Sequence, residues 1–261
     1  MQSNCYNSTG PILFAISVLT HCYFLKVRKP ILLTGNPTTE KLLSKCPSLC
    51  QLYWPSIVFN DAHLIFIPFI IQGLLYKFFI PFKYVSCIVV AKDGEELQVD
   101  FICPNDEYAL QEFVSHPVYD GYFALKQDLV KSTTIVVLHH GAMCDSRDLP
   151  GQGYIRQAHS RNWLVCCLNR RGHVRPLTCP RWNFFGSTED VRTLTADILS
   201  KRPKAQLLSI GLSSGSGLLA RHLGESGNDF SAGVGVCPGY NIEKCMARFK
   251  FPYQVCPLPK V

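Results

Sequence analysis

The stretch Gly211-Leu212-Ser213-Ser214-Gly215 follows a mainly apolar run, residues 205–210, and places a serine inside a Gly-x-Ser-x-Gly pattern. This pattern is typical of a nucleophile elbow, in which the serine occupies a sharp turn between a β-strand and an α-helix. Two backbones approach closely in such a turn, so the flanking positions need residues with little or no side chain. Gly211 and Gly215 meet that need. The pentapeptide alone is a weak signal, because Gly and Ser are also common in ordinary loops.

Strand and helix patterns alternate on either side of this serine. The first two expected strands form a hairpin around Asp93-Gly94, and the later ones are β-branched apolar runs typical of a parallel sheet. One expected helix starts at Ser187-Thr188-Glu189-Asp190, which has the form of a capping box, and another runs over residues 216–223. The sequence therefore predicts an α/β fold with a mostly parallel sheet and helices on both faces. The expected strands are residues 85–91, 96–102, 133–138, 163–168, 205–210 and 232–237.

A second motif supports the elbow. The expected strand at 133–138 runs into His139-His140-Gly141-Ala142. In acyl transfer the developing oxyanion needs two backbone N–H donors fixed in place. We expect one donor from Ser214 and the other from the loop after Gly141, with Ala142 as the first choice and Met143 as the alternative. The pair of motifs predicts a serine-hydrolase scaffold with Ser213 as the nucleophile.

Composition limits the classes of partner and cofactor. The 261 residues are 47% hydrophobic and carry a formal net charge of +7, which suits one large domain with an appended segment. The Lys and Arg residues are scattered without a basic stripe, so we expect no nucleic-acid partner and favour a membrane surface or an anionic substrate. The 13 cysteines lack zinc-type Cys-x-x-Cys pairs, which favours reduced thiols, a cytosol-facing domain and no metal.

The N-terminal part contains two apolar stretches. Residues 11–25 are followed by Lys26, Arg28 and Lys29, which predicts a single-pass membrane anchor with the body of the protein on the cytoplasmic side. This stretch is shorter than the roughly 20 residues of a full span, so a signal-peptide core or an interfacial helix remains an alternative. Residues 64–82 are interrupted by polar residues and Pro68, which favours a membrane-dipping or amphipathic helix over a second span, with a buried domain helix as the plain alternative.

These patterns divide the chain into three expected parts. Residues 1–26 form the N-terminal membrane anchor, residues 27–83 a membrane-proximal helical or irregular region, and residues 84–261 the α/β domain.

The ordered motifs also resemble a known family. Together they are similar to the membrane-anchored α/β-hydrolase domain proteins of the type 4 group, which includes mammalian monoacylglycerol and phosphatidylcholine lipases, plant embryogenesis-associated relatives and bacterial esterases. The resemblance covers about residues 27–250. It implies an α/β-hydrolase fold, hydrolysis of lipid or short-chain carboxylic esters, no cofactor, and a membrane-tethered enzyme, which we expect at the endoplasmic reticulum. The matching segments are Val137-Leu138-His139-His140-Gly141, Asn169-Arg170-Arg171-Gly172, Pro176-Leu177-Thr178-Cys179-Pro180-Arg181, Gly186-Ser187-Thr188-Glu189-Asp190 and Gly211-Leu212-Ser213-Ser214-Gly215.

The chain departs from this family at the catalytic triad, which follows the order serine, acid, histidine. After Ser213 the acidic residues are Glu225, Asp229 and Glu243, and the one histidine is His222. His222 lies nine positions along the same expected helix, about 13 Å from the serine, so we interpret it as a solvated residue and not as the base. No triad acid or base is identifiable, and we expect a fold that is incomplete after about the sixth strand, as in a C-terminally truncated member.

Earlier polar residues offer no replacement for the triad. We expect His140 to be a structural member of the oxyanion loop, and the pair His139-His140 to be local structure and not a metal site. Asp190 and Asp197 are interpreted as helix-cap and surface residues. A basic set after one strand offers a site for a phosphate head group, although a solvated loop with helix-packing arginines is the favoured interpretation; its members are Arg170, Arg171, His173, Arg175 and Arg181.

Two functional hypotheses therefore stand. The first is a serine hydrolase of carboxylic esters in lipids, of the acylglycerol lipase, phospholipase or short-chain carboxylesterase type. The second is a catalytically inactive, membrane-bound hydrolase-like module that binds lipid or a protein partner.

Overall fold

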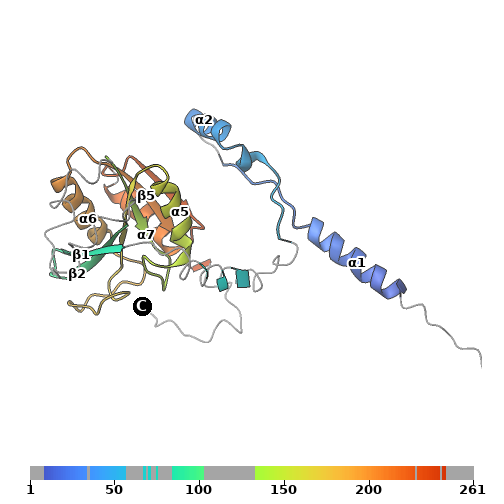
Figure 1. The fold of residues 1–261 in the computed structure, drawn as a ribbon, viewed down its shortest axis with the longest axis horizontal. Coiled ribbons are helices and arrows are strands. Elements are labelled where there is room, and N and C mark those ends of the chain that lie inside the picture. The colour runs from blue at the N-terminus through green and yellow to red at the C-terminus, as the bar shows by residue number, and fades with distance from the viewer. Residues whose placement is uncertain are drawn as a thin grey trace, which may run out of the picture. The chain divides into compact units, whose positions relative to one another are not determined.

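The computed structural model describes residues 9–33, 36–56, 67–68, 70–71, 75, 84–102, 133–226, 228–241 and 243–244. The chain divides into two compact units, residues 1–75 and 76–261 (Figure 1). Most of the predicted stretch at 64–82 lies outside the described residues.

The first unit is built from short helices. Helix α1 spans Thr9–Phe24, α2 spans Pro37–Lys45, and a 3-10 helix, η1, spans Pro47–Cys50. The Asn36 side chain caps α2 by accepting the Thr38 N–H at 2.8 Å, and Pro37 stands in the first turn, where its missing N–H costs nothing. A β-bridge joins Arg28 to Tyr53. Among the described helices, none combines the length and the apolar character needed to cross a membrane.

The second unit contains a six-stranded sheet in the order β1-β2-β4-β3-β5-β6. β1 pairs antiparallel with β2, β2 pairs antiparallel with β4, and β4, β3, β5 and β6 run parallel to one another. This order and these directions are those of the first six strands of an α/β-hydrolase fold, so the predicted fold class is confirmed. The strands are β1 (Tyr84–Val90), β2 (Glu96–Ile102), β3 (Thr134–His139), β4 (Leu164–Leu168), β5 (Gln206–Leu212) and β6 (Ala232–Val236).

Helices cover both faces of the sheet, as the alternating pattern predicted (Figure 1). Strand residues alternate between the two faces. On one face Val137 and Cys166 pack with apolar residues of α6 (Thr188–Lys201) and α7 (Ser214–Ser226). On the other face Val136, Leu138 and Cys167 pack with Ile155 and Ala158 of α5 (Leu149–His159). The central strands β3 and β4 are therefore buried on both sides, which accounts for their unbroken apolar character.

Two local expectations about the helices were wrong or incomplete. The side chain of Ser187 makes no capping hydrogen bond to α6, so the predicted capping box does not form. Helix α5 was not expected, because Pro150, Gly151 and Gly153 give this segment a low helix propensity. Packing against the sheet outweighs that propensity, and Ile155 is fully buried.

Helix α7 packs against β5 at unusually close range. A Cβ atom on Gly211 would lie 2.5 Å from the carbonyl oxygen of Gly215 and 2.7 Å from Cα of Ser216. A Cβ atom on Gly215 would clash with the carbonyl oxygen of His139 and lie 2.7 Å from that of His140. Because these neighbours are backbone atoms, they cannot move aside without shifting the strand or the helix.

Substitution of Gly215 should therefore separate packing from helix propensity. We expect Gly215→Ala to lower the free energy of unfolding by about 3 kcal/mol, because the added methyl group overpacks the junction. Gly217→Ala is the matched control, since no atom lies within 4 Å of its Cβ position, and it should raise that free energy by about 0.5–1 kcal/mol. Urea denaturation followed by tryptophan fluorescence measures both, and equal effects at the two positions would contradict the packing argument.

Buried His139 gives the fold a specific sensitivity to acid. The ring is 2% exposed, and neither ring nitrogen has a hydrogen-bond partner among the described residues. Burial lowers the pKa of His139 to about 3, with smaller contributions from His222 and Arg170. Below about pH 6.5 the imidazole of the unfolded chain is protonated, whereas that of the folded chain stays neutral. The contribution of His139 to the free energy of unfolding is therefore complete above that pH and falls as the pH drops toward 3.

The substitution His139→Leu, which keeps about the same volume, should remove this component of the acid sensitivity. Between pH 7.5 and pH 5, we expect the free energy of unfolding of the natural chain to fall by about 2 kcal/mol relative to that of the variant. The difference builds up at about 1.4 kcal/mol for each pH unit below 6.5. Denaturation curves at the two pH values measure this difference. A gap between the two proteins that is the same at both pH values would show that His139 is not the group responsible.

Candidate active site

Ser213 occupies the turn between the end of β5 and the start of α7. Its φ angle is 51°, in the left-handed region that residues other than glycine rarely adopt, and its side chain is exposed. The Ser213 N–H donates to the carbonyl of Val236 at 2.9 Å, and the Ser216 N–H donates to the carbonyl of Ser213 at 3.0 Å. Strained conformations of this kind occur at functional sites, where the surrounding structure fixes them. The backbone therefore presents Ser213 at the carboxyl edge of the parallel strands.

The loop after β3 lies directly against this turn. A Cβ atom on Gly141 would be 3.6 Å from Cβ of Ser213 and 3.8 Å from the carbonyl oxygen of Leu212. Ala142 comes next, and Met143 has a φ angle of 57° with its side chain 83% exposed. The structure thus brings Ser213 and the loop of the two candidate donors together.

Ser214, the other candidate donor, is the first residue of α7. The first N–H groups of a helix have no partner within the helix, and the aligned peptide dipoles make this end favourable for negative charge. The backbone N–H next to Ser213 is therefore in a suitable place to interact with an anionic oxygen.

His140 is held within the loop by both of its ring nitrogens. Nε2 accepts the backbone N–H of Arg170 at 3.1 Å, so the proton of the neutral ring is on Nδ1, which donates to the Gly141 carbonyl at 2.9 Å. Burial, followed by the charge of Arg170, lowers the pKa of His140 to about 3. His140 is thus a neutral structural side chain at pH 7 and a poor proton acceptor.

A buried carboxylate in β2 organises the far end of the same loop. Asp100 is 1% exposed and accepts two hydrogen bonds at Oδ2, from Ser146 Oγ at 2.5 Å and from Asn169 Nδ2 at 2.7 Å. Asn169 Oδ1 in turn accepts the Ser146 N–H at 3.0 Å. Oδ1 of Asp100 accepts from Ser86 and Gln98 of the hairpin. Asp100 was missed at the sequence level, because the alternation in Glu96–Ile102 places it on the same face as Glu96 and Gln98, which indicates a solvent-facing position.

The interpretation of His222 as a solvated residue is wrong. Its side chain is fully buried, and Nε2 lies 2.9 Å from both carboxylate oxygens of Asp229. Thr195 of α6 donates to the same carboxylate at 2.7 Å, and the ring of Phe230 lies 5.4 Å from the imidazole. Asp229 therefore links His222 of α7 to Thr195 of α6. His222 remains nine residues along α7 from Ser213.

The other acidic candidates after Ser213 are also occupied or exposed. Glu225 accepts hydrogen bonds from Thr188 at 2.7 Å and from Arg192 at 3.0 Å, both on α6. Glu243 is exposed. Within the described part of this unit, no histidine or carboxylate is hydrogen-bonded to the side chain of Ser213.

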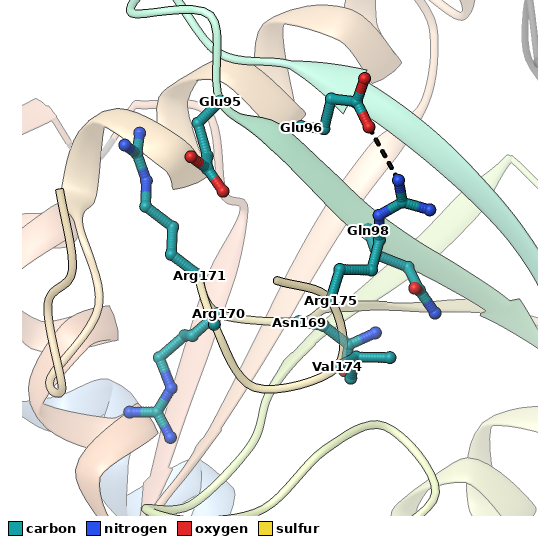
Figure 2. Close-up of a pocket in the computed structure, with 9 residues that line it drawn as sticks. Glu95, Glu96, Gln98, Asn169, Arg170, Arg171, Val174 and Arg175 are labelled. Carbon is teal, nitrogen blue, oxygen red and sulfur yellow. Dashed lines mark hydrogen bonds and ion pairs between the residues drawn. The ribbon is translucent and has the colours of Figure 1, made fainter. Parts of the chain in front are cut away.

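The predicted basic set does not converge on one ligand. Figure 2 shows the side chains of Arg170 and Arg171 leaving their loop in opposite directions, while Arg175 turns to Glu96, 2.8 Å away. The pocket between them has a volume of about 10 Å³, room for about one water molecule. A phosphate head group does not fit there. The favoured interpretation of a solvated loop with helix-packing arginines agrees with the structure. Residues 174–178 of the loop are exposed, whereas Arg170 and Arg171 are 5% and 9% exposed and contact the first turns of α7 and α6.

Arg171 instead forms a buried ion-pair network. Its guanidinium binds Asp190 at 2.5 and 2.8 Å and Asp93 at 2.7 and 3.1 Å. Asp190 is therefore the buried partner of an arginine and not a helix-cap residue, whereas Asp197 pairs with Lys201 one turn further along α6. An open cleft of about 640 Å³ lies beside this network, lined by residues 91–93, Arg171, 180–183, Ser187, Glu189, Asp190 and Thr193.

The described cysteines show no metal or disulfide chemistry. Those whose side chains the structure describes are free thiols, and no cluster of metal-binding side chains occurs among the described residues. Burial raises the pKa of Cys87 to about 12, so that side chain is a protonated thiol at neutral pH. Cys166 and Cys167 are fully buried within β4 as small apolar residues.

Comparisons with known proteins give structural neighbours only. No protein-family model and no curated protein matches this sequence. The esterase Pf2001 of Pyrococcus furiosus is 17% identical to this chain, with a TM-score of 0.48. The match covers 64% of this chain and 56% of the esterase. XC6422 of Xanthomonas campestris, an α/β serine hydrolase without a lid, is 13% identical over 61% of this chain and 63% of its own, with a TM-score of 0.41.

A thermostable carboxyl esterase of Bacillus coagulans is 14% identical over 59% of this chain and 44% of its own, with a TM-score of 0.41. The match therefore spans less than two thirds of each of these three proteins. The assignment of the α/β-hydrolase fold to this chain rests on its own strand order and on the turn at Ser213.

Proposed function

We propose that this chain is a serine hydrolase of carboxylic esters, with Ser213 as the nucleophile and the N–H groups of Ala142 and Ser214 as oxyanion donors. Met143 is the alternative donor in the loop. The observation that carries the proposal is the exposed serine with a φ angle of 51°, which lies against the loop that follows β3. The substrates that we propose are acylglycerols, phospholipids or short-chain esters, the classes that the family resemblance implies.

The arrangement provides for stabilisation of the oxyanion in acyl transfer, but not for removal of the proton from the serine. Attack of the Ser213 hydroxyl on an ester carbonyl converts the carbonyl oxygen to an oxyanion, and two fixed N–H donors stabilise it in the transition state. The hydroxyl also needs a base to take its proton, because a serine is a weak nucleophile at neutral pH. The described residues supply no such base, and donors without a base retain a rate some thousandfold or more below that of a full triad.

A second candidate follows from that contrast. The imidazole of His222 is fully buried and pairs with the half-buried carboxylate of Asp229, which also binds Thr195 of α6, so both groups are used in structural contacts. This observation favours a catalytically inactive, membrane-bound hydrolase-like module that binds a lipid or a protein partner.

Membrane attachment through the N-terminal region is part of the same proposal. Apolar side chains of α1 are exposed, among them Phe14, Ile16 and Leu19, and basic residues follow the helix. Exposed apolar surface of this kind favours burial in lipid, and the flanking positive charge favours a cytoplasmic body. We propose attachment at the endoplasmic reticulum membrane with the α/β domain on the cytoplasmic side.

The reactivity of Ser213 can be measured with a fluorophosphonate probe, which labels activated serines covalently. We expect labelling of the natural chain and its loss in Ser213→Ala, while Ser200→Ala, a change of an exposed serine on α6, leaves it unchanged. Labelling that is absent from the natural chain, or that survives Ser213→Ala, would exclude Ser213 as the nucleophile and favour the inactive module. Ester turnover that disappears in Ser213→Ala would exclude that module.

Membrane attachment is tested by alkaline carbonate extraction of cell membranes. We expect the full chain to stay in the membrane pellet, and a variant without residues 1–26 to be released to a larger extent. Complete release of the full chain into the supernatant would refute integral insertion.

A further inference from the structure

Arg170 contacts both halves of the proposed oxyanion site. The residue lies two positions after β4, and its side chain is buried. Nη1 donates to Ser214 Oγ at 2.9 Å and to the Phe184 carbonyl at 3.0 Å. Nη2 donates to the carbonyl of His140 at 3.1 Å and to the carbonyl of Gly141. One guanidinium group therefore joins the turn at Ser213 to the loop after β3.

The bond to Gly141 fixes the direction of the neighbouring N–H group. The carbonyl of Gly141 and the N–H of Ala142 belong to the same planar trans peptide, so they point in opposite directions. A donor that holds this carbonyl oxygen on one side also keeps the Ala142 N–H turned to the other side. Rotation of the peptide, which would turn the N–H away, would break a charge-assisted hydrogen bond in a buried place.

The bond to Ser214 holds the other donor through its side chain. Ser214 Oγ accepts from the same planar fork that binds the loop. Since a guanidinium is rigid, the two bonded segments keep one separation and one mutual orientation. Burial lowers the pKa of Arg170 to about 10, so the group stays charged at neutral pH and also contributes a positive charge beside the site.

We propose that Arg170 is a positioning residue that sets the two oxyanion donors, Ala142 and Ser214, relative to each other and to Ser213. This inference rests on the proposed ester hydrolysis at Ser213. A lysine at position 170 has one compact ammonium group and cannot replace a fork that binds two segments at once.

The test compares Arg170→Lys and Ser214→Ala in the full-length chain, with p-nitrophenyl butyrate as substrate. Active sites are counted by fluorophosphonate labelling, so that kcat refers to reactive protein only. We expect Arg170→Lys to lower kcat by about 100-fold, as loss of an oxyanion donor does, with KM changed by less than about 3-fold. Ser214→Ala keeps the backbone N–H and removes only the link to Arg170, and should lower kcat by about tenfold.

Two further measurements separate positioning from a general loss of structure. Ser214→Ala added to Arg170→Lys should cause no further loss, because both changes remove the same link. Free guanidinium ion at millimolar concentration should restore part of the kcat of Arg170→Ala, which a misfolded variant would not show. Arg175→Lys is the matched control, since Arg175 forms an exposed pair with Glu96 and contacts neither donor, and its kcat should equal that of the natural chain.

The outcomes separate the two proposals. If the natural chain shows neither labelling nor turnover that depends on Ser213, both the proposed hydrolysis and the role of Arg170 are overturned. A reactive natural chain whose kcat per labelled site is unchanged in Arg170→Lys overturns the role of Arg170 alone. Additive losses in the double variant also overturn it, because they show that Arg170 and Ser214 act separately.

Discussion

The close approach of α7 to β3 and β5 is the constraint on which the rest of the second unit depends. Gly215 lies against the carbonyls of His139 and His140, and Gly211 lies against the backbone of Gly215 and Ser216. This contact forces Ser213 into the left-handed region, because the chain must reverse between a strand and a helix that touch. It also brings the first turn of α7 beside the loop after β3, so the same packing that closes the core assembles the candidate site.

The sheet and the elbow were predictable because their signals are local. The runs at residues 135–138 and Leu164–Leu168 are apolar without interruption, and glycines at fixed offsets from Ser213 reveal a tight turn. Helix α5 was not predictable from propensity, since its first residues include Pro150, Gly151 and Gly153 and its stability comes from the sheet beneath it. Local patterns identify an element only where the local preference agrees with the packing.

The polar contacts within the domain were the part that the sequence could not reveal. Asp100 binds Asn169 69 positions later, and Arg170 binds Ser214 44 positions later. The sequence suggested that His222 was a surface residue. In the structure it pairs with Asp229, whose carboxylate also accepts a hydrogen bond from Thr195 on another helix, and no rule of spacing connects these positions. The identity of such partners depends on which chain segments the fold brings together. The proposed nucleophile and donors are therefore predictions from the sequence, whereas the polar contacts that support their positions are visible only in the structure.

Through Asp100, the hairpin of β1 and β2 influences the geometry of the candidate site at Ser213, although the hairpin contributes no reacting group to that site. The Asp100 carboxylate is bonded to neutral donors from β1, β2, the loop after β3 and the loop after β4, so four segments share a single buried charge. Neutralising that charge would weaken every one of these bonds at once. Sequence changes in the hairpin can then alter the geometry around Ser213 without touching it. A homologue with an intact Gly-x-Ser-x-Gly motif and a different hairpin should not be assumed to keep the same chemistry.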